Sequence, residues 1–387
     1  MRISERVQSL PPYLFAELER KITMRRAAGA DVISLGIGDP DTATPPHIVE
    51  ALMAGVRDPA THKYPSNRGE LAFRQAVAGC YERRFGVRLD VDTEIVPLLG
   101  AKEGVAHICS ALLDPEDVCL AADPGYPVYT SGPLLAGSAA AHVPLVPELG
   151  FQPDLEAIDA SILGRAKMIF VCYPNNPTGA VIEDDFFARL VAFARAHDVV
   201  VVHDNAYADI TFGGYVAPSF LETPGAKEVG VELFSLSKSY NMTGWRAGAI
   251  VGNPDVVDAY WRLKTNIDSG IFGAVQRAAV AALDGPQDCV REMCATYQRR
   301  RDLLVEALHG IGLRATAPKG TIYLWVPVPE GHTSASFTEQ VLNQADVVVS
   351  PGAAYGPSGE GYVRFSLTVP DARLEEAVGR IAERVRL

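Results

Sequence analysis

Lys238 stands between two serine residues in segment 235–246, which ends in Arg246. A lone lysine is usually a solvated surface group. A buried lysine amine, in contrast, can form a Schiff base with a carbonyl cofactor, and desolvation or a nearby cation favours its nucleophilic form. Lys238 is therefore a candidate catalytic group whose role depends on the residues around it.

Three other candidate groups follow short apolar runs of the sequence. Asp204 follows run 199–203, and it either caps the next helix or pairs with a protonated pyridine nitrogen, which turns such a ring into an electron sink. Asn176 either marks a tight turn or donates to a phenolate oxygen. Tyr126 either packs within a turn rich in proline and glycine or offers its flat face to a planar ring.

Two glycine-containing segments are candidates for binding an anion. Segment 99–104 opens a helical run, where free N–H groups favour phosphate and Lys102 adds positive charge. It lacks the Walker pattern GxxxxGK[ST], and segment 36–40 contains only G-x-G, not the dinucleotide fingerprint. The sequence therefore disfavours a Rossmann-type dehydrogenase.

Composition limits the class of protein and its partners. The chain has 387 residues, of which 48% are hydrophobic, and a net charge of −12. This length favours two domains, and the acidic balance argues against nucleic acid or an anionic membrane as a partner. No signal-peptide pattern or membrane-spanning run is evident, so a cytoplasmic location is expected. The cysteines lack ligand spacing, so no metal site is predicted.

Short apolar runs alternate with helical stretches through the first three quarters of the chain. Strands that are apolar on both faces predict a buried, mostly parallel sheet covered by helices, with ligands at the carboxyl ends of the strands. After about residue 286 the pattern changes to that of a smaller α+β lobe. Helices are predicted there over 291–309 and 372–385, and strands over 321–326 and 362–367. Arg299, Arg300 and Arg301 are predicted to lie on a solvated face of the first helix.

The order of these motifs along nearly the whole chain resembles that of the fold-type I pyridoxal-phosphate aminotransferases of class I/II. The resemblance is carried by Gly36–Ile37–Gly38, Tyr64, the Gly100 turn, Tyr126, Asn176, Asp204 with Tyr207, Ser235 with Lys238 and Arg246, and Arg364. It implies an α/β fold and pyridoxal 5′-phosphate as cofactor. The implied parts are an N-terminal arm that also forms part of the small domain (1–45), a large cofactor-binding domain (46–285) and a small C-terminal domain (286–387).

The resemblance also implies a role for each matching residue. Lys238 would hold the cofactor and carry the proton, Asp204 would bind the ring nitrogen, and Tyr126 would stack on the ring. Asn176 and Tyr207 would bind the ring's O3′ oxygen. The phosphate would be bound by Ala101, Lys102, Ser235, Ser237 and Arg246, and by Tyr64 from the other subunit of a homodimer. The substrate would meet Arg364, whose guanidinium can grip a carboxylate with two hydrogen bonds, and also Asn176, Ile37, Gly38 and Tyr13.

Segments 31–41, 62–65, 235–246 and 264–270 are similar to those of bacterial LL-diaminopimelate aminotransferases. This similarity implies transfer of an amino group from an L-amino acid to a 2-oxo acid such as 2-oxoglutarate, in lysine biosynthesis. Segment 350–356, Asn205 and Ser239 depart from that pattern, so a donor from specialised metabolism stays open.

Two further alternatives have the same fold. One is a lyase or decarboxylase that uses the same cofactor. The other is a non-catalytic domain of a transcription regulator, which the acidic charge and the start of the core within about the first thirty residues disfavour.

Overall fold

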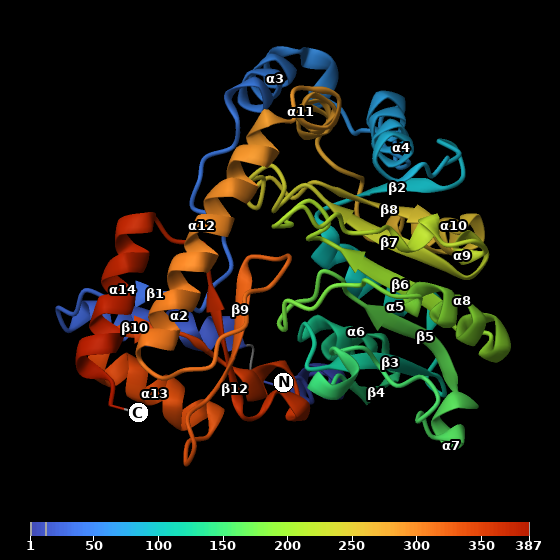
Figure 1. Ribbon diagram of the computed structural model, residues 1–387. Helices are drawn as coiled ribbons and strands as arrows, with labels where there is room; N and C mark the ends of the chain where they lie inside the picture. Colours follow the sequence, from blue (N-terminus) through green and yellow to red (C-terminus); the bar gives the residue numbers. More distant parts are fainter. Residues whose placement is uncertain (1, 12–13, 387) are drawn as a thin grey trace.

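The computed structural model describes residues 2–11 and 14–386, and within these ranges seven strands form one large sheet (Figure 1). Their spatial order is β2-β8-β7-β6-β5-β3-β4. Neighbouring strands are parallel except that β8 runs antiparallel to both β7 and β2. The strands are β2 (Ile95–Leu98), β3 (Val118–Asp123), β4 (Ala139–Pro144), β5 (Ala166–Val171), β6 (Val200–Asn205), β7 (Gly230–Ser235) and β8 (Gly248–Gly252). The predicted mostly parallel sheet is confirmed.

Both faces of this sheet are buried along its central strands, because alternate residues of these strands enter two different hydrophobic clusters. In β6, Val202 belongs to one cluster and Val201 to the other, and in β3 the same is true of Cys119 and Leu120. This is why the strands read as continuous apolar runs. The covering and flanking helices are α3 (Pro46–Arg57), α4 (Leu71–Phe85), α5 (Ala101–Leu112), α6 (Val128–Ala136), α7 (Ala160–Leu163), α8 (Phe186–His197), α9 (Ala226–Val229), α10 (Pro254–Lys264) and α11 (Gly273–Asp284).

The C-terminal part forms a smaller group of elements beside the large sheet (Figure 1). It contains a three-stranded antiparallel sheet in the order β11-β12-β9 within the described ranges. Its elements are α12 (Asp288–Gly310), β9 (Tyr323–Pro327), α13 (Ser334–Ala345), β10 (Val347–Val348), β11 (Ser350–Pro351), β12 (Tyr362–Ser366) and α14 (Asp371–Arg384). The helices and strands predicted after residue 286 are confirmed, with small shifts at their ends.

The N-terminal arm joins this smaller group. It contains α1 (Glu5–Gln8), α2 (Leu14–Ala27) and β1 (Ile33–Ser34), and β1 pairs in parallel with β10. Figure 1 shows the blue α2 and β1 beside the red C-terminal elements, whereas α1 contacts α6. Across residues 2–11 and 14–386, no helix is both long and apolar enough to span a membrane.

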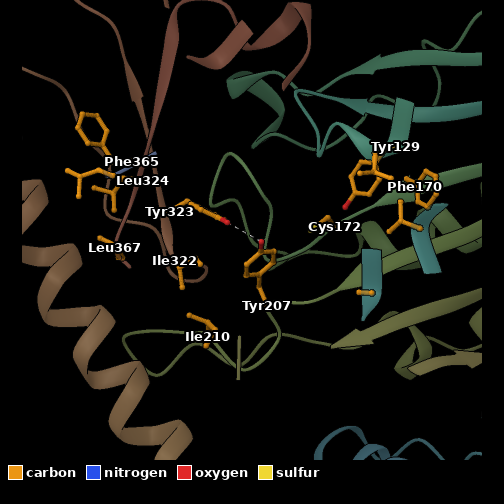
Figure 2. Packing of buried hydrophobic residues seen from close by; sticks show 14 of the residues in the cluster. Tyr129, Phe170, Cys172, Tyr207, Ile210, Ile322, Tyr323, Leu324, Phe365 and Leu367 are labelled. Carbon is orange, nitrogen blue, oxygen red and sulfur yellow. Dashed lines mark hydrogen bonds between the residues drawn. The ribbon is translucent and has the colours of Figure 1, made fainter. Parts of the chain in front are cut away.

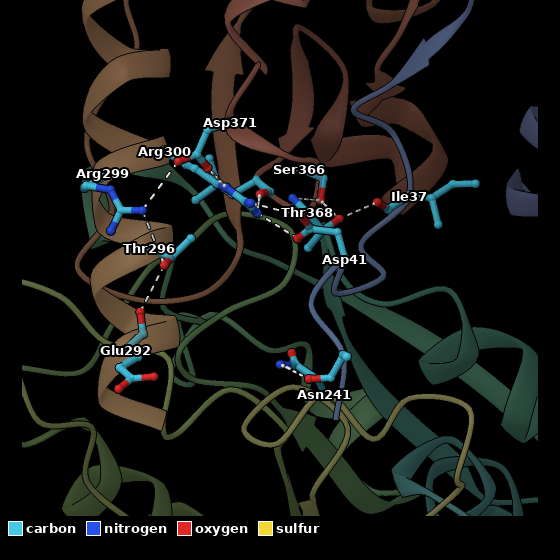
Figure 3. Close-up of polar contacts among 12 residues, drawn as sticks. Ile37, Asp41, Asn241, Glu292, Thr296, Arg299, Arg300, Ser366, Thr368 and Asp371 are labelled. Carbon is cyan, nitrogen blue, oxygen red and sulfur yellow. Dashed lines mark hydrogen bonds and ion pairs between the residues drawn. The ribbon is translucent and has the colours of Figure 1, made fainter. Parts of the chain in front are cut away.

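The prediction that three consecutive arginines of α12 face solvent was wrong. Consecutive helical residues point about 100° apart, so three of them cannot share one narrow face. Arg300 is only 6% exposed, and its guanidinium donates to both carboxylate oxygens of Asp41 at 2.7 and 2.9 Å. It also donates to Asp371 at 2.6 Å, as Figure 3 shows. Arg301 bonds the Pro318 carbonyl, whereas the side chain of Arg299 is 62% exposed.

Candidate active site

The predicted site residues gather at the carboxyl ends of the parallel strands. Tyr126 follows β3, Asn176 follows β5, Asp204 is the penultimate residue of β6, and Lys238 follows β7. Because these strands are neighbours in the sheet, their ends meet at one edge. Residues that are far apart in the sequence therefore lie close together in the structure.

The Lys238 amine contacts the N-terminal segment at this edge. Its Nζ donates a hydrogen bond of 2.6 Å to the Gly38 carbonyl. Burial lowers the pKa of Lys238, and the charges of Arg364 and Arg246 lower it further, while Tyr323 and Asp39 act in the opposite direction. A depressed pKa increases the fraction of neutral amine, which is the form that attacks carbonyls and accepts protons.

Asp204 is a buried carboxylate with one satisfied and one unsatisfied oxygen. Its Oδ2 accepts a 2.8 Å hydrogen bond from the Tyr129 hydroxyl, and Oδ1 is buried with no partner among the residues that the structure describes. Burial raises the pKa of Asp204, whereas the Tyr129 hydrogen bond and the charge of His203 counteract that rise. Buried oxygens of this kind normally have a donor. A protonated ring nitrogen of a bound cofactor would supply it, so the site fits pyridoxal phosphate.

Arg364, on β12, is fully buried beside Asn176. Its Nη1 donates to Asn176 Oδ1 and its Nη2 to the Gly36 carbonyl, both at 2.8 Å. The guanidinium carbon lies 3.8 Å from the centre of the Tyr323 ring and 4.8 Å from that of Tyr355. The planar fork is thus held in place between aromatic rings, a setting suited to binding a carboxylate.

Tyr207 and Tyr323 connect the two groups of elements within the site. Their hydroxyl oxygens lie 3.4 Å apart. Figure 2 shows the two hydroxyls pointing towards each other. Tyr207 was predicted as a site residue, but Tyr323 was read only as part of a strand. Its chain neighbours Ile322, just before β9, and Leu324 are buried as well, so no alternation in the sequence distinguishes it from the core.

Tyr129 was also missed by sequence analysis. It lies three positions after Tyr126, at the start of α6, and the two rings meet edge to face at 5.8 Å between their centres. The spacing is that of residues on one face of a helix, which is the one signal that could have linked them.

Backbone N–H groups, hydroxyls and a guanidinium come together at the start of α5. Ala101 is its first residue, and Gly100 before it has φ of +77°, with the Arg246 guanidinium filling the space that a Cβ would occupy. Ser235 pairs with Gly248, which packs against the Ala101 nitrogen. The Ser235 hydroxyl accepts from the backbone N–H of Ser237 at 3.2 Å. This combination is suited to a phosphate group.

The remaining predicted residues have different positions. The Lys102 side chain, in the first turn of α5, is exposed. The Ile37 carbonyl accepts a 3.0 Å hydrogen bond from Thr368, which ties it to the smaller group of elements. Tyr64 is 88% exposed, so this chain alone does not bring its ring into the buried site. Tyr13 lies outside the described residues.

Comparisons with known proteins agree with this arrangement. The sequence model of the family "Aminotransferase class I and II" matches residues 30–381. An LL-diaminopimelate aminotransferase of Desulforudis audaxviator is 55% identical over 98% of this chain and 96% of its own, and one of Dehalococcoides mccartyi is 53% identical over 99% and 98%.

Solved structures give the same result for the fold. Substrate-bound BacF from Bacillus subtilis superposes with a TM-score of 0.96 at 38% identity, covering 99% of this chain and 98% of that one. A mutant aspartate aminotransferase from Thermus thermophilus gives 0.92 at 30% identity, covering 99% and 100%. These matches extend over nearly the full length and include the sheet edge that holds Lys238 and Asp204. The chain therefore belongs to the class I and II aminotransferases, which are enzymes that depend on pyridoxal phosphate.

Proposed function

We propose that this aminotransferase moves the amino group of LL-diaminopimelate to a 2-oxo acid, 2-oxoglutarate, in lysine biosynthesis. The relatives at 55% and 53% identity carry the name of that activity. The transfer chemistry is supported above all by the buried Asp204 Oδ1, which has no partner among the described residues. A carboxylate in that state is suited to hold a protonated ring nitrogen.

We assign the cofactor contacts to the residues at the sheet edge. When bound, pyridoxal phosphate supplies an electron sink for the negative charge that develops at the substrate Cα. The start of α5 at Ala101 and Lys102, together with Ser235, Ser237 and Arg246, holds its phosphate. Asp204 holds the ring nitrogen, Tyr126 covers a face of the ring, and Asn176 and Tyr207 donate to its phenolic oxygen.

Lys238 is the group that moves the proton in this proposal. Its lowered pKa leaves more of the amine neutral, so Nζ can take the proton from the substrate Cα and later return it. The Gly38 carbonyl, which accepts from Nζ at 2.6 Å, holds the free amine in a defined position when it is not joined to the cofactor. Asp204 meanwhile stays at the ring nitrogen and exchanges no proton with the substrate.

Substrate binding is assigned to Arg364 and the N-terminal segment. The Arg364 guanidinium binds the α-carboxylate with two hydrogen bonds in exchange for its present neutral acceptors, Asn176 and Gly36. The backbone at Ile37 and Gly38 closes over the substrate, and Tyr13 contributes to the side-chain pocket.

A homodimer completes the proposal. Tyr64 is 88% exposed, and other large apolar residues are exposed on the neighbouring elements α3, α4 and the approach to α11. These residues are Met53, Val56, Leu71, Ile267 and Phe272. Figure 1 shows α3, α4 and α11 together at one end of the molecule. We propose that this end of the molecule faces a second copy of the chain and that Tyr64 reaches the phosphate site of the partner subunit. We also propose the domain boundaries 1–45, 46–285 and 286–387.

The substrate is tested by half-reactions of the purified enzyme loaded with cofactor. The absorbance of the bound cofactor is followed after mixing with LL-diaminopimelate and with a panel of other amino acids. Conversion is expected to be fastest with LL-diaminopimelate, and 2-oxoglutarate should then restore the starting spectrum. A faster reaction with another amino acid would replace the proposed donor. Turnover without any oxo acid would instead indicate a lyase or decarboxylase.

A further inference from the structure

Tyr129 makes a direct hydrogen bond to the carboxylate that we assign to the cofactor. Its hydroxyl lies 2.8 Å from Asp204 Oδ2, while Asp204 Oδ1 has no partner in the described ranges. Tyr129 is buried, so water does not compete for this bond. One oxygen of Asp204 is therefore occupied by the protein, and the other is left for a ligand.

The position of the Tyr129 ring is determined by its neighbours. It stacks on Phe170 of β5 with 4.8 Å between ring centres and 17° between the planes, and the edge contact with Tyr126 lies at 5.8 Å. Figure 2 shows the Tyr129 and Phe170 rings side by side. The Tyr129 N–H also donates to the Tyr126 carbonyl at 2.9 Å. These contacts prevent the phenol from turning away from Asp204.

The direction of the hydrogen bond follows from the chemistry of the two groups. Burial, and after it the charge of Asp204, raises the pKa of Tyr129 well above its ordinary value, so the phenol keeps its proton. The phenol must then donate, and the carboxylate accepts. A donated hydrogen bond favours the ionised carboxylate, which is the form that can hold a protonated ring nitrogen.

We propose that Tyr129 is a positioning residue that fixes the Asp204 carboxylate through Oδ2 and so directs Oδ1 to the ring nitrogen of the cofactor. This rests on the proposed pairing of Asp204 with that nitrogen. Because Tyr126 and Tyr129 belong to one turn and touch, the same element places the ring-stacking group and orients the nitrogen partner.

The test compares Tyr129→Phe with Tyr297→Phe in the full-length enzyme loaded with cofactor. Tyr297 is also a buried tyrosine, and its hydroxyl has no partner among the described residues, so its removal controls for loss of a buried hydroxyl. For Tyr129→Phe we expect kcat of the half-reaction to fall about tenfold, as for loss of a hydrogen bond to a charged group, with KM changed less than about twofold.

A second readout does not depend on turnover. Without the Tyr129 hydroxyl, Asp204 becomes more basic and draws the proton away from the ring nitrogen. The ¹⁵N signal of a cofactor labelled at that nitrogen should therefore move towards the value of a neutral pyridine in Tyr129→Phe and stay unchanged in Tyr297→Phe. If Tyr129→Phe fails to fold, 3,5-difluorotyrosine at position 129 keeps the shape and strengthens the donor, and the signal should move the opposite way.

The two proposals fail in different ways. An unchanged ¹⁵N signal in both substituted proteins, with kcat of Tyr129→Phe within twofold of the unmodified enzyme, would overturn the role of Tyr129. Any amino donor that reacts is adequate for this comparison. A failure of LL-diaminopimelate as donor would change the proposed substrate and leave the result for Tyr129 intact.

Discussion

The Lys238 amine and the Gly38 carbonyl form a 2.6 Å hydrogen bond although 200 positions separate them in the chain. Lys238 comes from the loop after β7, whereas Gly38 belongs to the N-terminal segment that is attached to the smaller group of elements. A side chain at position 38 would collide with the Tyr323 hydroxyl, so glycine is needed there. The amine, its acceptor and Tyr323 thus meet in one confined space.

Replacement of Lys238 by alanine should remove both the covalent attachment of the cofactor and the transfer of the Cα proton. We expect the cofactor absorbance to become that of the free aldehyde, and single-turnover rates to fall by about a thousandfold or more, the range for loss of a general base. Lys319→Ala is a suitable control, because Lys319 is an exposed lysine that pairs with Glu183. Normal turnover of Lys238→Ala would contradict the assignment.

Replacement of Arg300 by methionine should destabilise the protein, because it leaves Asp41 and Asp371 without their shared cation. The expected loss is about 2–4 kcal/mol in the free energy of unfolding, as for breaking a buried ion pair. Arg299→Met removes the adjacent, exposed arginine and should change stability by less than about 1 kcal/mol. Urea unfolding of both substituted proteins makes the comparison. Equal losses of unfolding free energy in the two proteins would show that the buried ion pairs of Arg300 contribute nothing to stability.

The arginine run shows what local sequence can and cannot predict. A charged helix over 291–309 is evident from its residues, and the structure extends it to Asp288–Gly310. The partner of Arg300 is not evident, because Asp41 lies 259 positions away. Helical rotation excludes three arginines on one face, but it does not say which of them turns inward.

Some residues of the candidate site could likewise be predicted from the sequence, and others could not. Lys238, Asp204, Asn176 and Tyr126 were predictable because each lies at or just beyond the carboxyl end of its own strand, and parallel strands bring these ends together. Tyr323 was not predictable, since its place depends on how β9 packs against the loop after β6. The roles assigned to these residues stay predictions that the experiments above address.

A buried hydrogen-bond network around Glu232 should make the free energy of unfolding depend on pH. Glu232 accepts from Tyr81 at 2.8 Å and from Asn205 at 3.1 Å, and its other oxygen lies 2.7 Å from His203 Nδ1. Burial acts to raise the pKa of Glu232, but the charge of His203 and the hydrogen bonds lower it below its ordinary value of 4.5. The unfolded chain therefore takes up the proton first as pH falls.

The stabilisation from Glu232 is fully present above about pH 4.5, where the unfolded carboxylate is ionised, and is lost as pH falls through the lower pKa of the folded state. Glu232→Gln should thus lower the free energy of unfolding by about 3 kcal/mol at pH 7, as for a buried pair left with one partner, and should flatten the decline of stability below pH 4.5. Glu228→Gln, at an exposed position of α9, is the control. Unfolding curves at several pH values decide the matter, and parallel curves for Glu232→Gln and the unmodified protein would refute the prediction.

The proposed contribution of Tyr64 across a dimer interface can be tested by mixing two impaired proteins. Lys238→Ala subunits lack the amine but keep Tyr64, and Tyr64→Ala subunits keep Lys238. In a hybrid dimer, the site of the Tyr64→Ala subunit contains its own Lys238 and receives the partner subunit's Tyr64, so it is complete. The other site lacks both groups.

Activity should therefore rise when the two proteins are unfolded together and refolded, above the sum of the separately refolded samples. In a random mixture about half of the dimers are hybrids, each with one complete site, so recovery should approach about one quarter of the unmodified activity if subunits exchange freely. If Tyr64 acted within its own chain, every hybrid would contain one site without Lys238 and one without Tyr64. The activity of the mixture would then equal the sum of the activities of the two separately refolded proteins, because no site would gain the residue that it lacks.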